Sequence, residues 1–337
     1  MNHDFQANFI RRALLAALVV SAGLLPVAHA QTAATGSGQV WPAKPIKVIV
    51  NFPPGGAADQ IARIVAQPLQ EALGQPVVVE NRGGSGGNIG GDAVAKSPAD
   101  GYTLLMSSGG MVSVNPHIYA KMSFDPAKDL TPVAAAARVL VFLVIRPGVP
   151  VNTMGEFINY AKANPGKLSY GSPGSGSSPH LAGEMLKSQA GIFAVHVPYR
   201  GAAPALQDLL AGQIDFYFDP GIGLNQVRAG KLKLLAVGSP KRSPLFPDAP
   251  TLSEAGLKGF DADTVFGFYA PAATPAPVIA RLNQEINRIL GTQAVKDRIA
   301  ALGGEALPIT PTEFAAKATE DTQRFGAIIR ERKISAD

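Results

Sequence analysis

Two segments of this chain, about 120 residues apart, share the order of a short strand, a loop rich in Gly, Pro and Ser, and a helix. The first is KVIVNFPPGGAAD (residues 47–59) and the second is LSYGSPGSGSSPH (residues 168–180), and an apolar-periodic helical pattern follows each. The start of a helix leaves N–H groups unpaired and carries the positive end of the helix dipole. Glycine lets such a backbone approach a ligand closely. Because neither loop contains Lys or Arg, the two junctions predict a small anion held by main-chain N–H groups.

The first 30 residues have the order of a secretory signal. Arg11 and Arg12 precede an apolar run that continues to Leu25, and the residues Ala-His-Ala at 28–30 form a small-x-small cleavage pattern. The run is shorter than the ~20 residues that a spanning helix needs. We therefore predict cleavage near Ala30 and export to the periplasm. The arginine pair leaves both the general secretory and the twin-arginine routes open.

Composition excludes several classes of function. The chain has no cysteine, which excludes disulfides, thiolate metal sites and cysteine nucleophiles. Beyond residue 30 it carries 28 basic and 24 acidic residues, a net charge of +4 that is scattered along the sequence. Without basic runs interleaved with aromatic residues, we expect no nucleic-acid partner. No later segment is apolar and long enough to span a bilayer.

The order of strand and helix patterns predicts an α/β fold with two lobes. Strands and helices alternate over residues 46–107 and again over residues 153–237, which is typical of βαβ units and parallel sheets. Val139–Ile145 and Thr264–Pro271 are apolar strands suited to cross between the lobes. The helices predicted after residue 276 have no strands of their own, so we expect them to pack on the first sheet. We thus assign residues 31–138 and 265–337 to lobe 1 and residues 139–264 to lobe 2.

One residue conflicts with this assignment. Pro68 lies within the helix predicted for Gln60–Leu73, and a proline in a helix interior costs about 3 kcal/mol. We expect either a kinked helix or two short ones.

Ligands of such folds bind beyond the carboxyl ends of the strands, where both glycine-rich loops lie. Arg200 follows one strand and precedes a helix, so it is either a clamp for a carboxylate or a solvated loop cation. Asp59 is expected mainly to cap its own helix. The candidate ligand-binding residues are Phe52, Gly56, Ala57, Ala58, Asp59, Ser108, Ser172, Ser175, Gly176, Ser177, Ser178, Arg200 and Asp219.

An enzyme is the competing hypothesis. The segment GGSGG (residues 83–87) matches the G-x-S-x-G pattern of a nucleophilic serine in hydrolases. The only histidines beyond residue 30 are His117, His180 and His196, and their spacing fits neither a zinc site nor a placed Ser–His pair. The chain also lacks a phosphate-binding G-x-x-x-x-G-K-[ST] segment. We therefore expect no catalytic residues, no metal and no cofactor, and we assign His180 a structural role at the start of its helix.

Several motifs resemble one known family. WPAKPI (41–46), LGQPVVVENR (73–82), ADGYTL (99–104) and HVPYRG (196–201) occur in this order. They are similar to motifs of the Bug family of periplasmic solute-binding receptors, the extracytoplasmic components of tripartite tricarboxylate transporters. The resemblance runs from about Trp41 to the C-terminus.

The resemblance implies a Venus-flytrap fold whose two loops hold a small carboxylate through main-chain N–H groups and bridging waters. On this sequence the loops are Phe52–Asp59 and Ser172–His180. Two departures matter: Ala57-Ala58 stands where the family usually has Gly-Thr or Gly-Ser, and Pro220 stands where Asn is common. For this reason the ligand of a relative cannot be transferred to this chain.

The leading hypothesis is a monomeric receptor that captures a small carboxylate and presents it to the membrane permease subunits of a tripartite tricarboxylate transporter, or to a sensor protein. An orphan receptor that feeds a signalling system remains an alternative, and an exported serine hydrolase is the third.

Overall fold

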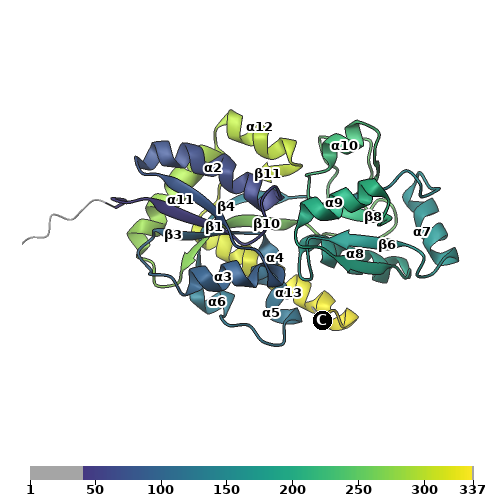
Figure 1. Ribbon diagram of the computed structural model, residues 1–337, viewed down its shortest axis with the longest axis horizontal. Helices are drawn as coiled ribbons and strands as arrows, with labels where there is room; N and C mark the ends of the chain where they lie inside the picture. Colours follow the sequence, from purple (N-terminus) through teal and green to yellow (C-terminus); the bar gives the residue numbers. More distant parts are fainter. Residues whose placement is uncertain (1–40, 336–337) are drawn as a thin grey trace, which may run out of the picture. The chain divides into compact units, whose positions relative to one another are not determined.

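The computed structural model describes residues 41–335, which contain two β-sheets with helices packed against both faces of each (Figure 1). The predicted signal segment and its cleavage site lie outside the described residues. Among the described helices, none is both long and apolar enough to cross a membrane.

The first sheet has six strands in the order β11-β4-β10-β3-β1-β2. Strands β1, β2 and β3 are parallel, as the alternating pattern predicts, whereas β10 and β11 run antiparallel to their neighbours. The sheet is therefore mixed and not purely parallel. Its strands are β1 (Ile46–Val50), β2 (Val77–Asn81), β3 (Thr103–Ser107), β4 (Leu130–Val139), β10 (Thr264–Pro271) and β11 (Gly304–Ala306).

Alternating residues of these strands build two cores, one on each face of the sheet. Val48 and Val50 pack with helices α2 (Ala57–Leu73), α11 (Ala276–Leu290) and α12 (Gln293–Ala301). Ile49, between them, faces a second core that includes residues of α3 (Asn88–Ala95), α4 (Gly109–Ser113) and α13 (Pro311–Arg332). This period of two is the pattern of a strand buried on both sides.

The second sheet has five strands in the order β7-β6-β8-β5-β9. Strand β6 is parallel to β7 and β8, and β5 is antiparallel to β8 and β9. Helices α7 and α8 contribute to one of its cores, and α9 and α10 to the other. The elements are β5 (Phe142–Ile145), β6 (Ser169–Ser172), β7 (Val195–Pro198), β8 (Phe216–Asp219), β9 (Lys233–Val237), α7 (Met154–Ala163), α8 (Ser178–Ala190), α9 (Ala202–Ala211) and α10 (Leu224–Arg228).

The chain passes from the first sheet to the second at Leu140 and Val141. The prediction of one strand over Val139–Ile145 is wrong, because β4 ends at Val139 in the first sheet and β5 begins at Phe142 in the second. Both strands are buried, so the apolar run shows no break at the crossing. Strand β10, which returns the chain to the first sheet, has the predicted bounds Thr264–Pro271.

The last helix does not pack on the first sheet alone. Phe314 near the start of α13 lies in a core of the first sheet, whereas Phe325 and Ile329 lie in a core of the second. The expectation for the C-terminal helices therefore holds for α11 and α12 and is wrong for the second half of α13.

Helix α2 is one helix, not two, and runs through Pro68. Ile61, Val65 and Leu69 on its inner face are fully buried. Burial of each such side chain stabilises the fold by about 1.5–3 kcal/mol, which together exceeds the cost of an interior proline. Five short elements have no counterpart in the sequence-based prediction, namely the 3₁₀ turn η1 (Ser85–Gly87), the helices α4, α5 (Asn115–Ile118) and α6 (Pro126–Asp129), and the strand β11.

Candidate functional site

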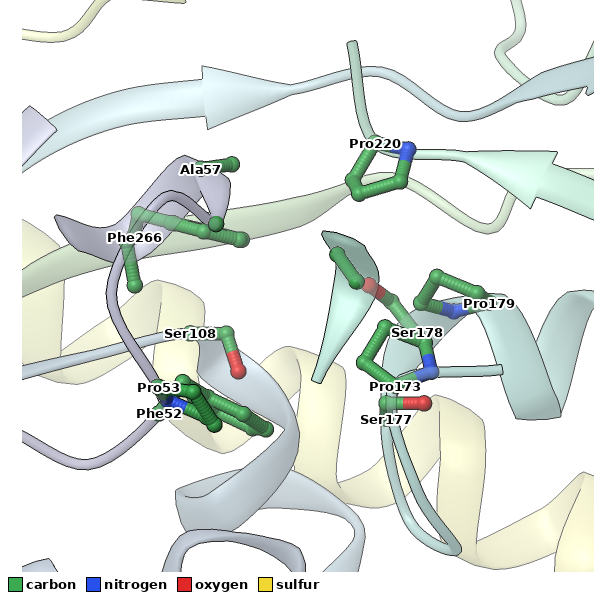
Figure 2. A pocket seen from close by; sticks show the side chains of 13 residues that line it. Phe52, Pro53, Ala57, Ser108, Pro173, Ser177, Ser178, Pro179, Pro220 and Phe266 are labelled. Atoms are coloured by element: carbon green, nitrogen blue, oxygen red, sulfur yellow. The ribbon is translucent and has the colours of Figure 1, made fainter. Parts of the chain in front are cut away.

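A small cavity, here called the inner chamber, is lined by residues that follow β1 and β3 of the first sheet and β6 and β8 of the second (Figure 2). Its volume is about 40 Å³, and none of the residues that line it carries a charge. These residues are Phe52, Pro53, Gly56, Ala57, Ala58, Ser108, Pro173, Ser177, Ser178, Pro179, Ala202, Pro220 and Phe266.

The N-terminus of α2 forms one wall of the inner chamber. Gly56 is its N-cap, and no side chain caps the first turn. The N–H groups of Ala57 and Ala58 have no acceptor within the helix, and both residues line the chamber. An anion placed there would receive these N–H groups and the positive end of the dipole of a 17-residue helix.

The N-terminus of α8 lies on the opposite wall. Ser177 is the N-cap: its Oγ accepts a hydrogen bond from the His180 N–H at 3.4 Å and donates one to the carbonyl of Gly174 at 2.7 Å. Pro179 has no N–H, so Ser178 supplies the free main-chain donor of this turn. The Ser177 hydroxyl therefore holds the loop in shape, while the Ser178 N–H is left for a ligand.

Ser108 supplies a side-chain donor on the first-sheet side of the chamber. It directly follows β3, is only 5% exposed, and lies in Figure 2 on the same side as Phe52, across from Pro173. Its Oγ has no hydrogen-bond partner among the described residues. An unpaired buried hydroxyl costs free energy, so a ligand oxygen in the chamber would relieve that cost.

A larger cavity, the outer chamber, adjoins the inner one and has a volume of about 770 Å³. Phe52, Pro53 and Pro173 line both chambers. Arg200 is the one charged residue among those that line the outer chamber, and Ser175 lines it as well. Both residues were predicted to bind ligand, and the structure places them outside the inner chamber.

Glycine allows the two sides of the cleft to approach each other. A Cβ on Gly86, whose φ is +60°, would lie 2.7 Å from the carbonyl oxygen of Ser175. A Cβ on Gly110 would lie 2.7 Å from the carbonyl oxygen of Gly176. Real Cβ atoms do not tolerate such distances, so these glycines permit contact between the first-sheet side and the loop after β6.

Asp59 lies behind the chamber and does not line it. Its carboxylate accepts hydrogen bonds from the Gly55 N–H, from Arg63 and from Asn81, each at 3.0 Å. Burial raises the pKa of Asp59, but these partners outweigh burial and lower it overall. Asp59 thus fastens the loop just before α2 instead of capping the first turn of the helix.

Two stacked histidines support the loop after β6. The rings of His180 and His196 lie 4.2 Å apart, and burial lowers their pKa values to about 4 and about 3. His180 Nδ1 accepts the Gly176 N–H at 3.2 Å, and His196 Nε2 lies 2.7 Å from the Ser172 Oγ. The predicted ligand residues Ser172 and Gly176 therefore shape the loop and are absent from the chamber wall, and His180 has the structural role expected of it.

Asp219, at the end of β8, is completely buried beside the chamber. One carboxylate oxygen accepts the Gly223 N–H at 2.8 Å, and the other has no partner among the described residues. Burial raises the pKa of Asp219 to about 7. Its neighbour Pro220, and not Asp219 itself, lines the chamber.

The structure gives the hydrolase hypothesis no support at Ser85. This serine has the positive φ of 48° that a strained nucleophile turn would show, but neither His180 nor His196 bonds it. The prediction that the fold brings no serine and histidine together is wrong, since the side chains of Ser172 and His196 are in hydrogen-bond contact. Ser172 is fully buried and its Oγ already accepts the Gly174 N–H, which leaves no access for a substrate. Within residues 41–335 no cluster of three or more potential metal-binding side chains occurs.

The apolar wall of the inner chamber was missed by sequence reasoning. Phe266 lies on β10, and Ala202 begins α9, more than 60 residues apart in the chain. Pro173 and Pro179 belong to the second glycine-rich loop, so their positions next to its serines were a usable signal. Nothing in the sequence indicates that Phe266 reaches the same chamber.

Comparisons with known proteins agree with this two-sheet fold. Residues 61–334 match the family model described as tripartite tricarboxylate transporter family receptor. The solved periplasmic binding protein BugD is 34% identical, with a TM-score of 0.83 over 88% of this chain and 99% of that one. Two proteins of Rhodopseudomonas palustris are also similar. Rpa4515, solved with adipate, is 34% identical with a TM-score of 0.85 over 88% of this chain and 99% of that one. MatC, solved with malate, is 31% identical with a TM-score of 0.82 over 86% and 100%. This chain belongs to the receptors of the tripartite tricarboxylate transporter family, and its two-sheet α/β fold is that of periplasmic binding proteins.

Proposed function

We propose that this protein is a periplasmic receptor that binds a small carboxylate in the inner chamber and delivers it to the membrane subunits of a tripartite tricarboxylate transporter. The carboxylate would accept hydrogen bonds from the Ala57, Ala58 and Ser178 N–H groups and from the Ser108 hydroxyl. Residues 31–138 and 265–337 would form one lobe and residues 139–264 the other, with the ligand between them and the second half of α13 packed onto the second lobe.

The observation that carries this proposal is the convergence of three unused donor groups on one uncharged chamber. Two helix N-termini, on α2 and α8, and the buried unpartnered hydroxyl of Ser108 surround it. Such a site suits an anion, because fixed N–H dipoles stabilise negative charge without a counter-charge. The solved relatives with adipate and with malate support a carboxylate as that anion.

The test is a thermal-unfolding screen of the mature protein against mono-, di- and tricarboxylates. For each carboxylate that raises the melting temperature, the corresponding neutral amide is the matched control. A ligand at one hundred times its Kd stabilises the folded state by about 2.7 kcal/mol. We expect at least one carboxylate to raise the melting temperature and its amide to leave it unchanged. If no carboxylate shifts the transition, or if amides act equally well, the proposal is wrong.

A further inference from the structure

The chain returns from the second sheet to the first through one residue, Asp263. Just before it, the Ala262 N–H donates to the carbonyl of Gly238 at 2.9 Å, and Gly238 directly follows β9 of the second sheet. Just after it, Thr264 begins β10 and pairs with Val139 in the first sheet. Asp263 lies between these two attachments, so a rotation of one sheet against the other changes the backbone torsions at this residue.

The carboxylate of Asp263 joins the two sides of this crossing. Its Oδ2 accepts hydrogen bonds from Arg138 of β4 at 2.7 Å and from the hydroxyl of Ser239, which lies just after β9. One oxygen is thus shared between a residue of the first sheet and a residue that follows the second. The other oxygen, Oδ1, has no partner among residues 41–335, and neither has the hydroxyl of the next residue, Thr264.

The other charges near Asp263 are engaged elsewhere or exposed. The guanidinium of Arg324 on α13 bonds the main-chain carbonyls of Asp261 and Asp263 at 2.7 and 3.2 Å. It also pairs with the carboxylates of Asp261 at 2.8 Å and Asp321 at 2.7 Å. The remaining charged residues of the cavity beside Asp263 are exposed, namely Glu305, Lys317 and Glu320. Within the described part of the chain, Arg138 is therefore the cation that pairs with this carboxylate, and its side chain is 33% exposed.

Burial costs the ionised carboxylate more than these partners return. Asp263 is only 4% exposed. Burial raises the pKa of Asp263 to about 7, although Arg138 and Ser239 both act to lower it. The loss of hydration of a buried ion pair can exceed its Coulomb attraction, and a buried acceptor without a partner costs free energy. Because groups from both sheets enclose this carboxylate, a rotation that separates them would let water reach the free oxygen.

We propose that Asp263 is a positioning residue of the hinge, whose ionised carboxylate opposes closure of the two lobes and is relieved when they open. This inference rests on the proposed function, which supplies the two lobes and the ligand between them, and it adds a residue that controls binding without touching the ligand. In this structure glycines bring the two sides of the cleft into contact, so it shows the closed form, in which the carboxylate is buried.

The sign of the pH dependence follows from this burial. The pKa of Asp263 in the closed form is about 7, above the ~3.9 of a hydrated aspartate. Protonation therefore favours closure, and this contribution is lost as the pH rises from about 4 to 7.

A distance between two spin labels in the ligand-free mature protein tests the proposal. The chain has no cysteine, so labels attach only where cysteines are introduced. Gln67→Cys on α2 and Gln207→Cys on α9 place them on exposed positions of helices that begin at opposite walls of the inner chamber. We expect a longer mean distance at pH 8.5 than at pH 5.5. Asp263→Asn keeps the shape and an acceptor for Ser239, and it should give the shorter distance at both pH values.

Two further variants separate this role from a general effect of buried carboxylates. Ser239→Ala removes a donor from the ionised carboxylate, so it should lengthen the distance at pH 8.5, opposite to Asp263→Asn. Asp219→Asn is the matched control, because Asp219 is also fully buried with a pKa raised to about 7, but residues 221–223, which follow β8, supply its hydrogen bonds. It should keep the pH dependence of the wild type.

Titration calorimetry with adipate and with malate connects the hinge to binding. The apparent affinity of a ligand scales with the fraction of protein in the binding-competent form. Asp263→Asn should therefore bind either probe about fivefold or more tightly than the wild type at pH 8.5, the lower range for relief of an unsatisfied buried group. The gain should be smaller at pH 5.5, where the wild-type carboxyl is protonated in the closed form.

The outcomes distinguish the hinge from the receptor. If Asp263→Asn lengthens the distance, the ion pair holds the lobes closed and the inference is overturned. It is also overturned if the wild-type distance does not change with pH, or if Asp219→Asn abolishes that change. If the distances behave as expected but neither these probes nor any other carboxylate binds, the role of Asp263 in the hinge stands and the proposed function fails.

Discussion

The substitution Ala57→Pro tests whether main-chain N–H groups hold the ligand. Ala57 is the first residue of α2 and follows the N-cap Gly56. Proline is favoured at this helical position, where its missing N–H breaks no intrahelical bond. Gly56 has φ −77° and ψ 168°, the extended conformation that a residue before proline prefers. The substitution therefore removes one donor from the inner chamber while the helix keeps its hydrogen bonds.

The expected loss follows from the chemistry of that donor. A hydrogen bond to a charged group contributes about 1.5–3 kcal/mol, so the affinity for a carboxylate should fall about 10- to 150-fold. The unfolding free energy of the ligand-free protein should fall by less than the binding free energy does, because the helix keeps its hydrogen bonds.

The proline ring also adds atoms to a residue that is only 4% exposed and lines the chamber. Ala57→Val is the matched control, because it adds similar bulk and keeps the N–H. Titration calorimetry with the best carboxylate, together with denaturant unfolding of the ligand-free proteins, separates the two effects. If Ala57→Pro binds like the wild type, or if Ala57→Val loses as much affinity, the N–H cradle is not what holds the anion.

Three further predictions concern the same site. Ser108→Ala should weaken carboxylate binding by about 1.5–3 kcal/mol without lowering the unfolding free energy, because it removes a hydroxyl that has no partner among residues 41–335. The control Ser177→Ala removes an N-cap and should lower the unfolding free energy by about 1 kcal/mol. Calorimetry and denaturant melts measure both effects, and equal behaviour of the two variants would contradict this prediction. Burial raises the pKa of Asp219 to about 7, above the ~3.9 of an unfolded chain, so the stabilisation that protonation of this carboxyl provides is lost as the pH rises from about 4 to 7. Asp219→Asn should accordingly be nearly neutral near pH 4 and stabilising at pH 8 in denaturant melts, and an equal effect at both pH values would refute this reasoning. Small-angle scattering of the mature protein should show a more extended form without ligand than with a saturating one, whereas identical curves would favour a rigid pocket.

The course of the backbone was largely predictable from the sequence because period-two and helical patterns are local. The strand Thr264–Pro271 was placed with its observed bounds, and the loops before α2 and α8 were identified by their glycines and serines. Strand β4 was missed over most of its length because Ala134–Ala137 have low β propensity and are held in the sheet mainly by pairing with β10, while β11 pairs only with the last residues of β4. Short helices such as α5, with four residues, give too few turns for a periodic signal.

The candidate site was predictable only where a local motif carried it. Phe52, Gly56, Ala57, Ala58, Ser108, Ser177 and Ser178 line the inner chamber, and their role in ligand binding stays a prediction. Ser172 and Asp219 are polar residues at strand ends like the others, but their side chains turn inward. Ser172 contacts His196, and Asp219 accepts the Gly223 N–H. Which way a side chain turns depends on partners distant in the sequence, and a local pattern does not contain that information.

The distribution of donors between the two sheets gives the proposed receptor a physical link between binding and closure. Ala57, Ala58 and Ser108 follow strands of the first sheet, whereas Ser178 begins a helix of the second. A carboxylate held by both groups gains its full set of hydrogen bonds only when the two sides are together, and it keeps part of the set when they separate. A ligand shifts a conformational equilibrium by its difference in affinity between the two states, here the donors that one side contributes. With helix dipoles worth about 0.3–2 kcal/mol each, and no charged residue lining the inner chamber, the proposed receptor would gain only a few kcal/mol from the donors that closure adds.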